Sequence, residues 1–154
     1  METRHTDDDI YAIYGVEEVP KARTLVDILT VTVHNHPDAT ALEGTNETLT
    51  YRELVDRINN EVNRLAELGI GKGDRIGIRV PSGTTDLYIA ILSTICAGAA
   101  YVPVDWDDPD SRANTVWEEA QVAAVYGQNL SIVQHGPQRE PITPSSPELT
   151  DHAW

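Results

Sequence analysis

The stretch Ala97-Gly-Ala-Ala-Tyr-Val-Pro-Val-Asp105 decides the fold of this chain. Gly98 follows an apolar run of helical spacing and can adopt the left-handed backbone that ends a helix. The residues after it are small, aromatic or β-branched, which is typical of a buried strand over residues 100–105. A helix that turns through glycine directly into a buried strand predicts an α/β architecture.

Helices and strands alternate on both sides of this stretch. Before it, the β-branched alternation of residues 75–80 predicts a strand, and a helix over residues 85–97 follows. After it, the pattern predicts a helix over residues 109–119 and a strand over residues 123–127. Because the connections are short, we expect the three strands to be parallel neighbours joined by right-handed crossovers.

The first part of the chain carries helix and hairpin signals. Apolar residues at helical spacing predict a helix that begins at Thr24, which can cap it, and ends near His36. Two short segments, residues 40–43 and 47–51, flank the turn-forming Gly44-Thr-Asn46 and predict a small hairpin.

A longer helix is predicted over residues 50–68. The side chain of Thr50 can accept a hydrogen bond from the amide of Glu53, and the Glu53 carboxylate can accept one in return, which makes a capping box. The apolar residues that follow recur at helical spacing: Leu54, Ile58, Val62, Leu65 and Leu68. Gly69 is placed to end this helix.

Together these elements predict an α/β fold, a three-layer parallel sheet with flanking helices, over residues 24–127. Residues 1–23 mix acids with glycine and proline and are interpreted as a flexible acidic arm. Residues 128–154 lose the apolar period and contain several prolines, so they are interpreted as a loop or tail.

Charge and cysteine content narrow the class of protein. The 154 residues include 25 acidic and 11 basic ones, a formal net charge of -14, which repels nucleic acids and anionic membranes. Residues 87–104 are uncharged, but Gly98 and Pro103 favour helix, turn and strand over a membrane span. The single cysteine, Cys96, excludes an internal disulfide, and no signal peptide is apparent, so we expect a cytoplasmic protein.

Three stretches, in order, resemble one known family. They are Leu49-Thr-Tyr-Arg-Glu-Leu54, Leu68-Gly-Ile-Gly-Lys-Gly-Asp-Arg75 and the stretch that ends at Asp105. Together they resemble the adenylation domains of nonribosomal peptide synthetases, within the adenylate-forming superfamily, and the resemblance covers residues 24–127. Residues 81–88 and 105–110 look most like the subgroup that makes poly-amino acids such as polylysine.

The resemblance implies a large enzyme that uses ATP and Mg²⁺ to couple an amino acid to AMP and then loads a carrier-protein thiol. In that family the phosphate-binding loop, the substrate pocket and the mobile lysine would lie beyond Trp154. We therefore expect a partial N-terminal subdomain without catalytic, cofactor-binding or metal-binding residues, inactive alone. Its expected partner is the remainder of the domain, or a second copy of itself. A noncatalytic interaction module and a fragment of an acyl-CoA ligase are the alternatives.

Two clusters in the sequence could be mistaken for binding sites. Gly69-Ile-Gly-Lys-Gly73 is glycine-rich, but it closes a helix and opens a strand, whereas a phosphate cradle follows a strand and opens a helix. The aspartates at 105, 107, 108 and 110 could supply oxygen ligands to Ca²⁺, but the pattern lacks an EF-hand glycine and distal glutamate. We interpret Asp107 to Asp110 as caps and dipole partners of the following helix.

The histidines, serines and cysteine that could act as metal ligands or nucleophiles lack the partners that such sites need. His34 and His36 are two residues apart, so they do not share a helical face, and no metal-ligand spacing accompanies them. Ser82 and Ser93 have no nearby histidine that could complete a triad. Cys96 sits in an apolar helix, where packing is its expected role.

Overall fold

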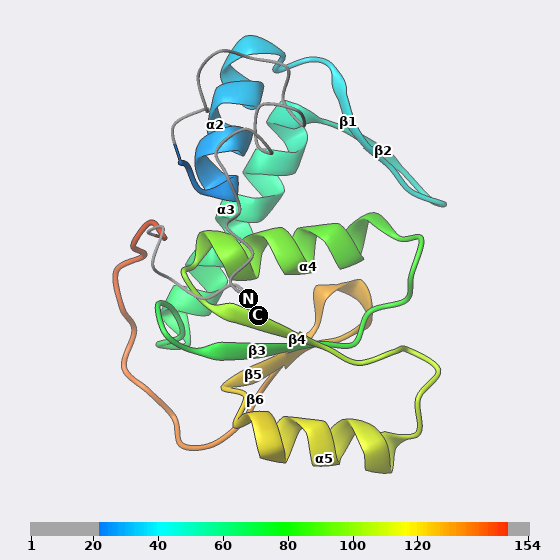
Figure 1. Ribbon diagram of the computed structural model, residues 1–154, viewed down its shortest axis with the longest axis vertical. Coiled ribbons are helices and arrows are strands. Elements are labelled where there is room, and N and C mark those ends of the chain that lie inside the picture. The colour runs from blue at the N-terminus through cyan, green and yellow to red at the C-terminus, as the bar shows by residue number, and fades with distance from the viewer. Residues whose placement is uncertain (1–21, 148–154) are drawn as a thin grey trace, which may run out of the picture.

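The computed structural model describes residues 22–147, which form a sheet with helices on both faces and a smaller unit built on a hairpin (Figure 1). Residues 1–21, most of the predicted acidic arm, lie outside the described part. In chain order the elements are α2 (Leu25–Asn35), β1 (Thr40–Glu43), β2 (Thr48–Thr50), α3 (Tyr51–Glu67), β3 (Arg75–Ile78), α4 (Thr85–Cys96), β4 (Ala100–Pro103), α5 (Asp110–Ala120), β5 (Ala124–Tyr126), the 3-10 helix η1 (Gln128–Leu130) and β6 (Ile132–Gln134).

The larger sheet has four strands in the order β4-β3-β5-β6. β3 pairs in parallel with β4 and with β5, and Gly77 is the register partner of Val102 on one side and Val125 on the other. The predicted set of three parallel neighbours is therefore confirmed. α4 covers one face of the sheet and α5 the other, which gives the three layers (Figure 1).

The last strand corrects the sequence-based interpretation. β6 pairs antiparallel with β5, so the sheet is mixed and mostly parallel rather than wholly parallel. The interpretation of residues 128–154 as loop or tail was wrong for residues 128–134, which form η1 and β6. Asn129 and Leu130 take left-handed backbone conformations that reverse the chain, and the Gly127 amide then donates to the Ser131 carbonyl at 2.8 Å. β6 has only two apolar residues, Ile132 and Val133, and they lie in a polar stretch that shows no period.

Side chains alternate between the two faces of the sheet. Ile76, Ile78 and Tyr126 pack with α3 and α4, whereas Val102 and Val125 pack with α5. Gly77 points toward α5, and a methyl group there would come 2.7 Å from the ring of Trp117. The indole can therefore lie directly on the strand only because this position has no side chain.

Glycine ends both of the helices for which the sequence predicted it. Gly69 has φ of +70° after α3, and the amide of Ile70 donates to the carbonyl of Leu65 at 2.9 Å. After α4, Gly98 has φ of +75°, and the amide of Ala99 donates to Thr94 at 3.1 Å. Both ends are Schellman motifs, in which glycine avoids the steric cost of the left-handed conformation.

Capping boxes begin α2 and α3, the first two helices of the part that the structure describes. Thr50 and Glu53 bond reciprocally at the start of α3, as predicted, and Thr24 and Asp27 do the same at α2. The hydrogen bond from the Thr50 amide lowers the pKa of the Glu53 carboxyl. Both helices thus begin where side chains satisfy otherwise unpaired backbone amides.

Helix α2 contributes less to the core than its apolar spacing suggests. Leu25, Ile28 and Val31 are 58%, 40% and 50% exposed, and no residue of α2 is fully buried. Leu29 packs against the main core. Residues 87–104 form most of α4, a turn and β4, as predicted, and within residues 22–147 no helix is long and apolar enough to cross a membrane.

Candidate functional site

The connectivity of the sheet marks one edge as the candidate site. The chain leaves the carboxyl end of β3 toward α4 on one face, and it leaves the carboxyl end of β4 toward α5 on the other. The connections of these adjacent strands therefore separate at this edge, which we call the carboxyl edge. In open α/β sheets ligands bind at such switch points.

A cavity of about 340 Å³ lies at this switch point. Its walls are mostly apolar and come from Ile78, Val80, Leu87, Pro103, Val104 and Trp106. Ser82, Asp105 and Asp107 supply its polar groups. Trp106 is 40% exposed, so a large aromatic surface borders solvent at the mouth. We call this the switch cavity.

Arg79, at the carboxyl end of β3, holds the loop that carries Trp106. Its Nη1 donates to Asp110 Oδ1 at 2.6 Å, and its Nη2 donates to the carbonyl of Asp108 at 2.5 Å. Nε of Arg79 is buried and has no hydrogen-bond partner in the described part of the chain. The guanidinium thus joins β3 to the start of α5 and fixes one wall of the switch cavity.

Of the four aspartates weighed as calcium ligands, Asp108 and Asp110 bond to this arginine, and all four lie in the loop or at the start of α5. Asp105 Oδ1 accepts the amide of Asp107 at 2.9 Å, and Asp108 pairs with Arg112 at 3.1 Å. The expectation that they cap α5 was wrong in detail, because the N-cap is Pro109 and no side chain caps the helix. Asp110 lies in the first turn, where its charge favours the helix dipole. Among residues 22–147 no group of three or more potential metal ligands is placed to hold an ion.

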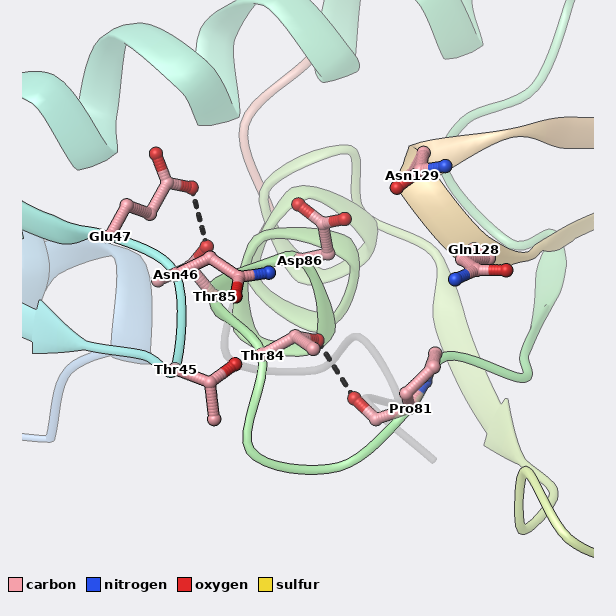
Figure 2. A pocket seen from close by; sticks show the side chains of 9 residues that line it. All are labelled: Thr45, Asn46, Glu47, Pro81, Thr84, Thr85, Asp86, Gln128 and Asn129. Atoms are coloured by element: carbon pink, nitrogen blue, oxygen red, sulfur yellow. Dashed lines mark hydrogen bonds between the residues drawn. The ribbon is translucent and has the colours of Figure 1, made fainter.

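A second cavity, of about 210 Å³, lies beside the first and shares Pro81 with it (Figure 2). Three segments line it: the β1–β2 turn, the start of α4 and the turn after β5. Glu47 accepts the Thr85 hydroxyl at 2.6 Å and pairs with Arg57 at 2.8 Å, which ties the hairpin to α4. We call this the polar cavity.

The polar cavity presents carboxylates, amides and hydroxyls. Figure 2 shows the carboxylate of Asp86 and the amides of Asn46, Gln128 and Asn129 around the same space. The backbone of Asn129 is left-handed, with φ of +56°, which sets this residue against the cavity at a conformational cost. Because Glu47 is paired with Arg57, the Asp86 carboxylate is the charge here that opposes a polyphosphate and suits neutral or cationic groups instead.

Of the residues at the two cavities, the sequence had drawn attention only to Ser82, Asp105 and Asp107, and it assigned no site to them. The signal that could have found them was the predicted parallel sheet, because the carboxyl ends of residues 75–80, 100–105 and 123–127 had to meet at one edge. The residues of the polar cavity come from three separate segments, so no local motif marks them.

The other residues considered in the sequence lie apart from each other. Ser82 is exposed at the switch cavity, whereas Ser93 is fully buried in α4. His34 lies in the last turn of α2 and His36 is its C-cap. Cys96 packs half-buried against the core, and burial raises the pKa of its thiol to about 11. The structure therefore does not bring a serine or cysteine together with either of these histidines.

The glycine-rich run lies at the opposite edge of the sheet. Residues 69–73 follow α3 and precede β3, as predicted, so they sit at the amino edge, away from both cavities. The Gly73 amide donates to the Gly98 carbonyl at 3.2 Å, and the Ala100 amide donates to Asp74 at 2.9 Å. The run therefore joins the ends of the two helices instead of opening one.

Comparisons with known proteins agree on one family. A sequence model of the family described as AMP-binding enzyme matches residues 29–152. Gramicidin S synthase 1 of Brevibacillus brevis is 32% identical over 120 residues, which make up 77% of this chain and 11% of that protein.

Solved structures give the same result. The N-terminal subdomain of NpsA from Klebsiella oxytoca matches with a TM-score of 0.64 and 26% identity over 75% of this chain and 30% of its own. AB3403, a four-domain nonribosomal peptide synthetase bound to AMP and glycine, matches with a TM-score of 0.64 and 33% identity, over 70% of this chain and 8% of its own. The chain spans a small part of each of these proteins.

Proposed function

Because the chain belongs to the AMP-binding enzyme family, we propose that it is the scaffold-forming N-terminal part of an amino-acid adenylation domain. In such a domain the carboxylate of an amino acid attacks ATP, an aminoacyl-AMP forms and pyrophosphate leaves. The acyl group then passes to a carrier-protein thiol. In this proposal ATP and Mg²⁺ are bound by other parts of the domain.

One observation carries the proposal: the residues of the three family-like stretches build the framework. Thr50 and Glu53 cap α3, and the amide of Gly73 donates to Gly98, so that two of the stretches meet in space. Tyr101 and Val102 face the two cores on either side of the sheet. These residues hold strands and helices together, which is the role that the proposal assigns to them.

The charges at the carboxyl edge also support a framework role for this chain, with ATP bound by other parts of the domain. Arg79, the basic side chain that joins β3 to α5 there, is already bonded to Asp110 and Asp108. The polar cavity next to it carries Glu47 and Asp86. A triphosphate needs aimed amides or cations to offset the cost of its desolvation, whereas Glu47 is already paired with Arg57 and the Asp86 carboxylate opposes a triphosphate.

We extend the proposal to the subgroup that makes poly-amino acids. The two segments that resemble this subgroup, residues 81–88 and 105–110, both contribute to the switch cavity, through Leu87 and Trp106 among others. Variation between subgroups would then be concentrated at the carboxyl edge, which is the edge where ligands of α/β sheets bind. Product analysis of the active domain, a poly-amino acid or an amino acid in a mixed peptide, tests this extension.

The experiment that tests the proposed function is a domain fusion. The segment of gramicidin S synthase 1 that matches this chain is replaced by residues 22–147 within that protein's adenylation domain. The fusion should incorporate labelled pyrophosphate into ATP in the presence of an amino acid, because the scaffold positions but does not perform the chemistry. The same relative with the segment deleted is the control and should be inactive. A fusion that folds, by circular dichroism and a cooperative melt, yet exchanges no pyrophosphate with any amino acid contradicts the proposal.

A further inference from the structure

Neither the sheet nor the cavities explain why the turn of residues 69–73 contains three glycines. A segment from the end of the described chain lies against this turn. Residues 136–142, which we call the strap, follow β6 and run along the side of the molecule toward α3, in orange to red in Figure 1.

Asp74 connects the turn with the strap. Its Oδ2 accepts the amide of Gly71 at 2.9 Å, which holds the turn closed, and its Oδ1 accepts Arg139 Nη1 at 2.7 Å. Three residues further along, the amide of Ile142 donates to the carbonyl of Ala66 at 2.9 Å. The strap is therefore bonded to α3 and to the turn at two separate points.

The strap lies close to two of the glycines, and its backbone leaves no room for a side chain at Gly69. A methyl group on Gly69 would come 2.5 Å from the carbonyl oxygen of Glu140 and 2.6 Å from Cβ of Arg139. A methyl group on Gly71 would come 2.7 Å from Cδ1 of Ile142. Gly73 differs, because nothing lies within 4 Å of the position its methyl group would take.

We propose that the turn of residues 69–73 is an intramolecular docking site for the strap, with Asp74 as the residue that locks it in place. Gly69 allows the backbone of the strap to approach closely, and Gly71 leaves space for the side chain of Ile142. The docked strap leads the chain from β6 across the amino edge of the sheet, and its bonds to Asp74 and Ala66 fix the direction of the chain beside α3. Docking of the strap does not depend on the proposed function. Only the expected effect on pyrophosphate exchange in a complete domain rests on it.

The matched pair Gly69→Ala and Gly73→Ala tests the docking site. Both glycines have a left-handed backbone, with φ of +70° and +85°, so both substitutions carry a similar conformational cost. Only the methyl group at position 69 meets the strap. The measurement is the hydrogen-exchange rate of the Ile142 amide in the full chain, with core amides of β3 as the internal reference. Gly69→Ala should raise this rate at least about ten-fold, and Gly73→Ala should change it by less than about two-fold.

Arg139→Ala provides a second variant that leaves the turn itself intact. It should also accelerate exchange at Ile142 without changing exchange in β3, because it removes the bond to Asp74 and nothing in the core. An Ile142 amide that exchanges freely in the unmodified chain overturns the proposal. Equal acceleration by Gly69→Ala and Gly73→Ala, with no effect of Arg139→Ala, also overturns it.

The fusion with gramicidin S synthase 1 separates this inference from the proposed function. In an active fusion Gly69→Ala should lower the rate of pyrophosphate exchange more than Gly73→Ala does. A fusion that folds but is inactive contradicts the proposed function, while hydrogen exchange at Ile142 in the chain alone still decides whether the strap is docked.

Discussion

The phenol oxygen of Tyr126 lies 3.1 Å from Oε2 of Glu61, and both residues are buried between the sheet and α3. Nη1 of Arg64 donates to both oxygens of the same carboxylate, at 2.7 and 2.8 Å, and to the carbonyl of Leu130 at 3.2 Å. The network thus joins α3, β5 and the left-handed turn beside the polar cavity. The buried carboxylate of Glu61 is tolerated because the Arg64 guanidinium and the Tyr126 hydroxyl both donate hydrogen bonds to it.

The first prediction concerns the pH dependence of stability. Burial, and secondarily the Glu61 carboxylate, raise the pKa of Tyr126 above its ordinary value of 10.0. Above about pH 10 the unfolded tyrosine ionises while the folded one stays protonated, so this contribution to stability falls by about 1.4 kcal/mol per pH unit. Urea titrations at pH 9 to 11 should show a steeper loss for the unmodified chain than for Tyr126→Phe. Equal slopes would show that the phenol is not held by the network.

The second prediction tests the core. Leu65 is fully buried in α3, and Leu65→Ala should lower the free energy of unfolding by about 2 to 5 kcal/mol, since the surrounding structure only partly collapses onto the cavity. Leu25→Ala is the matched control: Leu25 is 58% exposed on α2, and its loss should cost less than about 1 kcal/mol. Denaturant titration measures both. Similar losses in the two variants would mean that burial does not distinguish these positions.

The third prediction concerns Cys96, the one cysteine of the chain. Burial raises the pKa of its thiol to about 11, so little reactive thiolate is present at pH 8. Labelling with a thiol reagent should be on the order of 10²-fold slower in the folded chain than in urea, where a thiol pKa near 8.5 applies. Rapid labelling of the folded chain would contradict the packing role assigned to this residue.

Much of the fold could be predicted from the sequence because the residues that begin and end the helices act on neighbours only a few positions away. Thr50 with Glu53, and Gly69 and Gly98, mark helix ends through contacts within a few residues. β6 was not predicted, because its two apolar residues, Ile132 and Val133, lie in a polar stretch without a period, and its antiparallel pairing with β5 leaves no local signal. The burial of Glu61 was equally hidden, since Tyr126, its partner, is 65 residues away in sequence.

The candidate site was less predictable for the same reason. The sequence drew attention to residues that cluster along the chain, such as Asp105 and Asp107, and these support the loop beside the switch cavity. The polar cavity combines a hairpin turn, a helix start and the turn at Asn129. Only the assembled sheet brings such segments together, and only the strap adds a second reason for glycine at position 69 to the one that the end of α3 gives.

The fourth prediction concerns the apolar stripe on α2, formed by Leu25, Ile28 and Val31. An exposed stripe of this kind binds hydrophobic dyes and favours self-association. We expect the triple substitution of these residues by glutamine to lower dye fluorescence and any association seen by light scattering. Leu29→Gln, which disturbs the packed side of the same helix, should raise dye binding instead. Unchanged dye binding in the triple variant would show that this stripe is not the accessible apolar surface.

Nucleotide binding tests the central claim, that this chain supplies the scaffold of an adenylation domain and not its chemistry. The chain has a net charge of -14, and its glycine-rich turn lies at the end of α3, where it is bonded to the strap. Isothermal titration of the chain with ATP and Mg²⁺ should therefore show no saturable binding tighter than roughly 100 μM, about -5.5 kcal/mol. Saturable binding with a dissociation constant below roughly 100 μM would contradict the claim. If mutation of Arg79 or of the residues at either cavity abolished that binding, the nucleotide site would lie at the carboxyl edge.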